Sequence, residues 1–284
     1  MKIGLIIQGP ITTYGNGPNN APLGFDARAC IEANIEKFSP LVEKIVISTW
    51  KNSGYIASKA HTSLHLLEND PITGWDYDNQ KKQFYSTTQA VDWLLKNTGC
   101  THIIKVRTDQ EFTIDLIDWV RSLYANKDST SDQGGLIVFS EGIKKENFYI
   151  GDFIFIAPIR QMKSVCDAVL MQQKQLQPIN ANDYVFKMIK YLDPGSKIGG
   201  AIANSFALAR NGKRLQELWI NLLKNRITVL PRDIYKKIIW RGRPMTDVLP
   251  SLDTAFYFHE EIERAKHGNL DWSMIVNLDS RNVK

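Results

Sequence analysis

Three strand-length runs of apolar residues, separated by helical patterns, constrain the fold more than any other feature of this sequence. Residues 2–7, 44–48 and 102–106 are short and apolar almost throughout, a pattern typical of strands that are buried on both faces. Between them, apolar side chains recur at helical spacing over residues 27–38 and 79–96. This strand–helix–strand order predicts parallel pairing through right-handed crossovers. We therefore expect an α/β fold with a mixed, mainly parallel sheet that is flanked by helices.

The same pattern continues to about the middle of the chain and then loosens. Residues 64–67 and 135–140 are strand-like, whereas the glycine, proline and asparagine content of residues 12–24 predicts a loop. No internal repeat or low-complexity linker marks a domain boundary. We expect residues 1–190 to form the main domain, and residues 191–284 to form a mostly helical extension packed on it.

Composition limits the classes of protein that are compatible with this chain. It has 284 residues, of which 43% are hydrophobic, enough for a large core. No apolar run approaches the roughly 20 residues that span a bilayer, and the first residues lack the features of a signal peptide. We therefore expect a cytoplasmic protein.

Cysteine, histidine and net charge narrow the classes further. Cys30, Cys100 and Cys166 lack metal-like or redox-like spacing, and the five histidines show no zinc-binding pattern. The cysteines are therefore predicted to be small core residues. The net charge of +5 suits an anionic small ligand or an anionic membrane surface, and it does not require nucleic-acid binding.

Polar residues follow the first two predicted strands. Gln8, Gly9 and Pro10 come directly after the first strand, and Thr49 and Trp50 follow the second. Open α/β sheets bind ligands where their strands end, and a glycine there lets a ligand approach the backbone. We expect these five residues to line one ligand-binding edge of the sheet.

The strand at 102–106 ends in a cation, a hydroxyl and a carboxylate, namely Arg107, Thr108 and Asp109. Lys105 and Arg107 alternate along the strand and so can face the same side. A guanidinium and a carboxylate at such an edge can hold a phosphate and, through a metal, a second anionic oxygen. The alternative is a structural ion pair between Arg107 and Asp109.

Further candidate side chains lie at the start of the helix predicted at 79–96. Asn79, Lys82 and Gln83 belong to its first turns, where backbone N–H groups also point outward. These side chains either bind a ligand or only cap the helix and face solvent.

Two acidic residues and one basic stretch complete the set of candidates. Asp152 precedes a run of large apolar residues, where a carboxylate is costly unless it is paired or functional. Asp183 begins a predicted helix and is either a functional carboxylate or its cap. Residues 234–243 are basic and aromatic, which fits a solvated basic face or contact with lipid headgroups or an anionic acceptor.

Five blocks in this order, at residues 6–11, 47–50, 79–87, 104–109 and 151–153, resemble the WavE group of lipopolysaccharide-synthesis proteins. These proteins are similar to glycosyltransferases of the GT-A type. The resemblance covers the first two thirds of the chain. It implies a GT-A-like fold, a nucleotide-sugar donor and a saccharide or lipid-linked saccharide acceptor. It also implies a role in lipopolysaccharide or capsule synthesis, with peripheral contact at the cytoplasmic face of the inner membrane.

The chain departs from the GT-A pattern at one position. These enzymes usually carry a DxD motif whose carboxylates hold Mn²⁺ or Mg²⁺ on the donor phosphates, whereas the matching triplet here runs from Arg107 to Asp109. The resemblance leaves two alternatives. Asp109 acts as a single metal ligand, with phosphate oxygens and water completing the shell, or Lys105 and Arg107 neutralise the leaving phosphate without a metal.

The resemblance also suggests roles for the remaining candidates. Asp152 is the first candidate for the base that takes the acceptor proton, because apolar neighbours would raise the pKa of its carboxyl, and Asp183 is the second. Base and ribose contacts are expected from Gln8, Gly9, Pro10, Thr49 and Trp50, and sugar or phosphate contacts from Asn79, Lys82 and Gln83. Two alternatives stay open: a metal-independent transferase that uses a CMP-activated acidic sugar, and a non-catalytic sugar- or nucleotide-binding protein.

Overall fold

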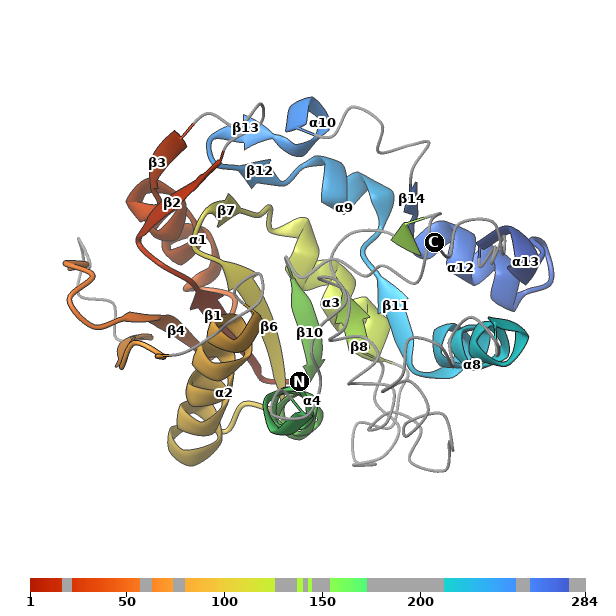
Figure 1. Cartoon of the computed structure of the whole chain (residues 1–284), viewed down its shortest axis with the longest axis horizontal. Helices are drawn as coiled ribbons and strands as arrows, with labels where there is room; N and C mark the ends of the chain where they lie inside the picture. Colours follow the sequence, from red (N-terminus) through yellow and green to blue (C-terminus); the bar gives the residue numbers. More distant parts are fainter. Residues whose placement is uncertain are drawn as a thin grey trace.

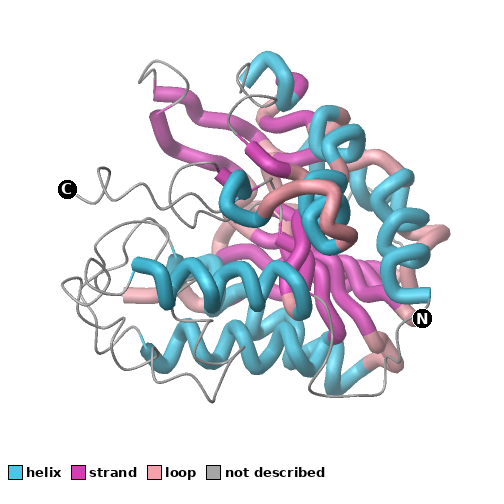
Figure 2. The backbone as a smooth tube through the Cα atoms, turned by 90° about the vertical axis from the view of Figure 1, so that its right-hand side faces the viewer, coloured by secondary structure: helices cyan, strands magenta, loops and turns pink. Residues whose placement is uncertain are grey.

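A seven-stranded sheet with helices on both faces forms the centre of the molecule (Figures 1 and 2). The computed structural model describes residues 1–16, 22–56, 63–73, 80–125, 137–139, 143–144, 154–172, 212–248 and 256–275. The strand order is β11-β8-β10-β6-β1-β4-β5. The strands are β1 (Ile3–Gln8), β4 (Lys44–Trp50), β5 (Leu64–Asn69), β6 (His102–Arg107), β8 (Ile137–Phe139), β10 (Phe155–Pro158) and β11 (Ile227–Val229).

The sheet is mixed and mainly parallel, as the sequence predicted. β1 pairs in parallel with both β4 and β6, and β5 pairs in parallel with β4. β10 runs antiparallel to its neighbours β6 and β8, while β11 is parallel to β8. Among these strands only β10 is reversed, so the carboxyl ends of the other strands lie at the same edge.

Two apolar clusters cover the two faces of the sheet, because successive side chains of a strand point to opposite faces. In β6, for example, Ile103 belongs to one cluster and Ile104 to the other. The first cluster includes side chains of α2 (Gln80–Asn97), α4 (Ile159–Gln172) and α8 (Gly212–Asn225). The second includes side chains of α1 (Arg28–Phe38), α3 (Asp115–Ala125) and α9 (Arg232–Lys236).

Short elements surround this core. β7 (Gln110–Glu111), β12 (Ile239–Trp240) and β13 (Arg243–Pro244) form a small three-stranded sheet, and β9 (Ile143–Lys144) pairs with β14 (Phe256–Tyr257). The remaining helices that the structure describes are α10 (Met245–Val248), α12 (His259–Lys266) and α13 (Trp272–Ile275).

The prediction of a loop at residues 12–24 is wrong. β2 (Thr12–Asn16) and β3 (Pro22–Asp26) pair antiparallel there, in a register that places Thr12 opposite Asp26. Glycine and proline weaken a central strand, but a two-stranded ribbon outside the main sheet has few neighbours to lose and tolerates them.

The part of the chain after residue 190 contributes to both sheets. β11 is the edge strand next to β8, and β12 pairs with β7, which directly follows β6. The expected boundary at residue 190 therefore separates segments that share a sheet. The division into a main domain and an extension stays a prediction.

The three cysteines are buried free thiols, as the sequence predicted. Burial raises the pKa of the Cys166 thiol to about 12, so this side chain is a neutral part of the core. Among the described helices, none has the length and apolar character that crossing a bilayer requires.

Candidate functional site

The carboxyl ends of β1, β4 and β6 bring the predicted residues together at one edge. Gln8 is the Cα partner of Ser48 on one side and of Arg107 on the other. The Gly9 N–H donates to the Ser48 carbonyl at 3.1 Å, and the Thr108 N–H donates to the Gln8 carbonyl at 3.0 Å. The turns that follow these three strands are therefore tied to one another by backbone hydrogen bonds.

Gly9 is required by its neighbours in this turn. Its φ is +139°, and an added Cβ would lie 2.7 Å from the hydroxyl oxygen of Thr108. That hydroxyl donates to the Pro10 carbonyl at 2.7 Å. The absence of a side chain at Gly9 thus makes room for Thr108, which the sequence did not reveal. The expected approach of a ligand to the Gly9 backbone stays a prediction.

Asp109 lies at the centre of a buried charge cluster. Only 1% of its side chain is exposed, and its two carboxylate oxygens accept hydrogen bonds from Arg107 Nε and Nη2 at 2.9 and 3.0 Å. The ion pair that the sequence left open as an alternative is therefore present. Two further donors reach Asp109 Oδ2, namely Trp240 Nε1 at 3.1 Å and Arg241 Nε at 2.9 Å. We call these four residues the Asp109 cluster.

The Asp109 cluster is positively charged. Burial alone would raise the pKa of Asp109, but the guanidinium groups of Arg107 and Arg241 outweigh it and hold this pKa at about 2. The carboxylate is therefore ionised throughout the physiological pH range. One negative and two positive side chains leave the cluster with a net charge of +1.

The donor set around Asp109 does not fit a divalent cation. Both carboxylate oxygens of Asp109 already accept hydrogen bonds. The guanidinium groups of Arg107 and Arg241 would also repel a metal cation bound to the same carboxylate. Within the described part of the chain, no three His, Cys, Asp or Glu side chains form a group that could hold a metal. Asp109 is therefore not a metal ligand in the chemistry proposed below.

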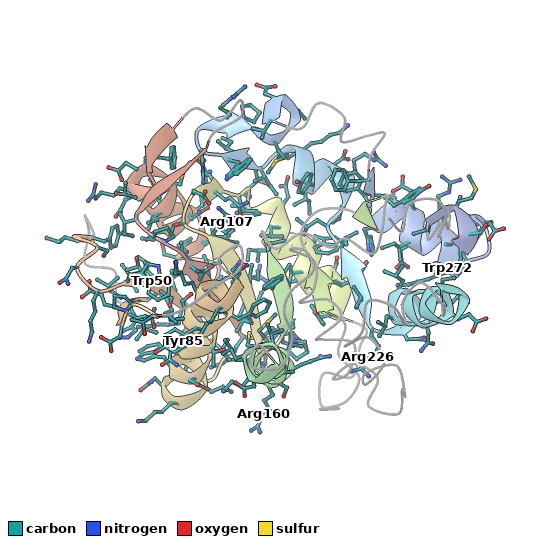
Figure 3. The ribbon with its side chains drawn as sticks, in the orientation of Figure 1. Trp50, Tyr85, Arg107, Arg160, Arg226 and Trp272 are labelled. Carbon is teal, nitrogen blue, oxygen red and sulfur yellow. The ribbon has the colours of Figure 1, made fainter. Side chains whose placement is uncertain are left out.

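The two basic residues of β6 have different environments. Lys105 is fully buried, with its Nζ 4.7 Å from the ring centroid of Phe155. The Arg107 side chain is 26% exposed and lies at the upper end of the sheet in Figure 3. Of the two cations that were expected to contact a phosphate, Arg107 is the one that reaches the surface.

Buried hydrogen bonds connect the end of β4 to β5 and α2. The Ser48 hydroxyl donates to the Ser86 carbonyl at 2.8 Å. Asn69 Nδ2 donates to Ser48 Oγ at 2.9 Å and to the Thr49 carbonyl at 2.8 Å. Thr49 is fully buried, while Trp50 is half-buried and lies at the end of the strand (Figure 3).

The first turns of α2 are brought towards the same edge by these bonds. Lys82 and Gln83 lie about one turn before Ser86, which contacts Ser48. The hydroxyls of Ser86 and Thr87 donate to the carbonyls of Lys82 and Gln83, both at 2.8 Å. These hydroxyls are therefore used within the helix, whereas Lys82 and Gln83 stay candidates for ligand contact.

Three predicted residues, Asn79, Asp152 and Asp183, lie outside the described residues. Close to Asp152 in sequence, Ile154 and Phe155 are buried against opposite faces of the sheet. The roles suggested for the three polar residues stay predictions.

Sequence reasoning missed Trp240 and Arg241. The stretch at 234–243 was expected to be a solvated basic face or a contact with lipid headgroups or an anionic acceptor. The solvated face is wrong for its aromatic and apolar side chains, since Tyr235 and Ile238 are buried and Trp240 donates to Asp109; contact with lipid or an acceptor stays a prediction. A usable signal was the pair Arg241 and Gly242 between two short strand-like runs, because glycine in such a pair favours a tight hairpin.

Comparisons with known proteins give remote matches only. No protein-family model and no curated protein matches the chain, so the resemblance to the WavE group stays a prediction. A glycosyltransferase involved in the glycosylation of the major capsid of PBCV-1 is 9% identical, with a TM-score of 0.44 over 94% of this chain and 100% of that one. A putative glucose-1-phosphate thymidylyltransferase from Bacillus anthracis is 12% identical, with a TM-score of 0.38 over 73% and 95%. HddC from Yersinia pseudotuberculosis is 10% identical, with a TM-score of 0.37 over 57% and 79%. Similarity of this degree assigns no function.

Proposed function

We propose that this protein is a glycosyltransferase that moves a sugar from a nucleotide-sugar donor to a saccharide or lipid-linked saccharide acceptor. The Asp109 cluster at the carboxyl edge of the sheet carries the proposal. Ligands of open α/β sheets bind at this edge, and arginine side chains suit phosphate groups because their planar donors match phosphate oxygens.

The arrangement suggests how the donor would be activated. Transfer breaks the bond between the sugar and the phosphate, and negative charge develops on the phosphate oxygen. A guanidinium fixed beforehand stabilises that charge without reorganising during the reaction. Asp109 supplies this fixation, because it holds Arg107 through both carboxylate oxygens.

The other predicted residues surround this position in the proposal. Gln8 and Trp50 lie at the ends of β1 and β4, where a base and ribose would be bound. Lys82 and Gln83 would contact the sugar or the phosphate. Asp152 and Asp183 stay the candidates for the base that accepts the acceptor proton.

The acceptor and the cellular role rest on the WavE-type resemblance alone. On that ground we propose a role in lipopolysaccharide or capsule synthesis, at the cytoplasmic face of the inner membrane. The extension after residue 190 would then face the acceptor or the membrane.

The charge of the Asp109 cluster also favours a second candidate. A CMP-activated acidic sugar carries one phosphate and one carboxylate, which two guanidinium groups can bind separately. This reaction would need no metal, and the donor set around Asp109 does not fit one. The nucleotide of the donor distinguishes the two candidates.

Thermal unfolding of the full chain tests the proposal. UDP-, GDP-, CMP- and dTDP-sugars would each be added with EDTA and, separately, with Mn²⁺. A donor at one hundred times its Kd stabilises the folded state by about 2.7 kcal/mol, so one nucleotide should raise the unfolding midpoint. A response to CMP-sugars alone selects the second candidate, and no response to any donor contradicts both.

Two matched arginine variants locate the donor. Arg107→Ala should abolish the donor-induced shift. Arg160→Ala should retain it, because Arg160 is exposed and follows Ile159, whose N–H binds Thr101 at the opposite end of the sheet (Figure 3). An unchanged shift in Arg107→Ala would place the donor elsewhere.

A further inference from the structure

We infer that Arg241, at the tip of the β12–β13 hairpin, is a second phosphate-binding residue of the donor site. On this inference, which rests on the proposed function, Arg107 and Arg241 together neutralise the leaving phosphate in place of a divalent metal. Asp109 is then the positioning residue that orients both guanidinium groups.

The side chain of Arg241 is held by one hydrogen bond and one ring contact. Its Nε donates to Asp109 Oδ2 at 2.9 Å, and its Cζ lies 5.3 Å from the ring centroid of Trp240. Its two terminal nitrogens make no hydrogen bond with any residue that the structure describes. A guanidinium carries five N–H donors, so four are left for a ligand. The side chain is 19% exposed, which gives a ligand access to it.

The backbone of Arg241 is in an unusual conformation. Its φ is +50° and that of Gly242 is +75°, values typical of a two-residue hairpin turn whose first position normally holds asparagine, aspartate or glycine. A residue with a longer side chain is strained in this region, and such strain is concentrated at functional sites. The Arg241 N–H donates to the Asp109 carbonyl at 2.9 Å, which fixes the hairpin tip over the cluster.

Within the described part of the chain, Arg241 shares its carboxylate with Arg107. Lys237 pairs with Asp115 and Lys37 pairs with Glu111, one cation to one anion. Asp109 instead serves two arginines, and Arg107 already engages both of its oxygens. An additional anion beside Arg241 would match the charge of its guanidinium, and a phosphate suits its planar donors.

The reaction can be written without a metal. The bond between the anomeric carbon and the phosphate oxygen breaks, and its electron pair stays on the oxygen of the departing nucleotide. The acceptor oxygen bonds to the same carbon, and its proton passes to a carboxylate, for which Asp152 and Asp183 are the candidates. Arginine contributes charge and hydrogen bonds but no proton, because it stays protonated in proteins.

Equilibrium binding of nucleotides to the full chain tests this inference. UDP, GDP, CDP, dTDP and CMP would be titrated by calorimetry in EDTA and in Mn²⁺, beside the matching nucleosides. We expect the wild type to bind one nucleotide equally well in both buffers. Arg241→Gln should weaken that nucleotide at least about tenfold, as expected for lost hydrogen bonds to a charged group, and leave the nucleoside unchanged.

Arg243→Gln is the matched control. Arg243 is an exposed arginine on the same hairpin, so this variant removes the same charge and should leave nucleotide binding unchanged. Arg241→Lys keeps the charge but loses the planar fork, and it should bind with intermediate affinity. This variant is also the test if Arg241→Gln does not fold.

Each contrary result has a distinct meaning. If the wild type binds a nucleotide and both Arg241 variants bind it equally well, the inference is overturned and the proposed function stands. Binding that requires Mn²⁺, or an equal loss in Arg243→Gln, also overturns the inference alone. If the wild type binds none of the nucleotides or nucleotide-sugars, the proposed function fails and the inference fails with it.

Discussion

The charged side chains at the two ends of the central sheet differ in their exposure to solvent. At the amino end, Lys2 and Glu43 form an ion pair at 3.3 Å whose side chains are 58% and 40% exposed. At the carboxyl end, the Asp109 side chain is 1% exposed and accepts hydrogen bonds from two arginines and a tryptophan. The same sheet therefore has a solvated ion pair before β1 and β4 at its amino end and a buried cluster after β6 at its carboxyl end.

The difference in burial explains why the cluster around Asp109 is a candidate site and the exposed ion pair is not. Water screens an exposed ion pair, so its formation stabilises a protein by only about 0–1 kcal/mol. A buried carboxylate must be compensated by fixed partners, and these partners are thereby held in a defined geometry. The carboxyl end can accordingly offer oriented cations to a ligand, while the cation at the amino end is exposed to solvent.

Removing the central carboxylate should give the largest effect. Asp109→Ala leaves Arg107 and Arg241 without their shared anion, and breaking a buried pair costs about 3–5 kcal/mol. Urea unfolding would measure the loss in the free energy of unfolding. Glu43→Ala, which breaks the exposed pair, should change the free energy of unfolding by less than about 1 kcal/mol. Equal losses in the two variants would contradict the difference between the exposed pair and the buried cluster.

Acid should destabilise the two ends in separate pH windows. The unfolded chain protonates Asp109 near pH 3.8 but the folded chain only near pH 2, so its stabilisation is complete above pH 4 and is lost as pH falls towards 2. At 1.36 kcal/mol per pKa unit this loss is roughly 2–3 kcal/mol. Stability measured against pH should show this loss in the wild type and not in Asp109→Asn.

The amino end contributes an earlier step. Burial, together with the positive N-terminus, lowers the pKa of His102 from 6.5 to about 4. The unfolded chain therefore binds a proton between these values that the folded chain does not, and stability falls as pH falls through this window. His102→Gln should remove this step and leave the loss of stability below pH 4. If His102→Gln and Asp109→Asn each abolished the same single step, the two pH windows would not be separate.

Two glycines sharpen the contrast at the level of the backbone. Gly9→Ala combines a φ of +139° with a Cβ 2.7 Å from Thr108 Oγ1, and we expect a loss of about 2 kcal/mol in the free energy of unfolding. Gly99→Ala at the amino end meets only the flexible Lys2 side chain, at 3.5 Å or more. Its effect should be within about 0.5 kcal/mol, as measured by urea unfolding of both variants.

Trp240→Phe should give the smallest loss at the carboxyl end. It removes the N–H that donates to Asp109 Oδ2 at 3.1 Å but leaves both guanidinium groups on the carboxylate. One hydrogen bond to a charged acceptor contributes about 1.5 kcal/mol. A loss in urea unfolding as large as that of Asp109→Ala would show that the indole, rather than the charges, holds the cluster.

Much of the fold was predictable because its signals are local. The expected strand at 102–106 is β6 (His102–Arg107), and the expected helix at 79–96 is α2 (Gln80–Asn97). A strand buried on both faces is a continuous run of apolar residues, and a helix buried on one face has apolar residues at helical spacing. Both patterns can be recognised within a short stretch of sequence. The hairpin of β2 and β3 was missed because its stability comes from cross-strand pairing, which its composition does not show.

The candidate site was predictable up to the edge of the sheet. Parallel strands end on one side, so Gln8, Ser48 and Arg107 were expected at one edge, and the strand pairing makes them neighbours. The environment of each side chain was not predictable in this way. Lys105 was expected beside Arg107 at a phosphate, and its full burial over the Phe155 ring could not be read from the sequence; its contact with a phosphate stays a prediction.

The sequence by itself determined that β1, β4 and β6 are buried parallel strands and that polar residues stand at their carboxyl ends. Tertiary structure alone decided what Asp109 is. Its partners Trp240 and Arg241 lie 131 and 132 positions further along the chain, and they reach it because β12 pairs with β7 directly after Asp109. A carboxylate that a local motif presents as a metal ligand thus becomes the anchor of two arginines, because the partners of a buried charge are set by packing and not by sequence spacing.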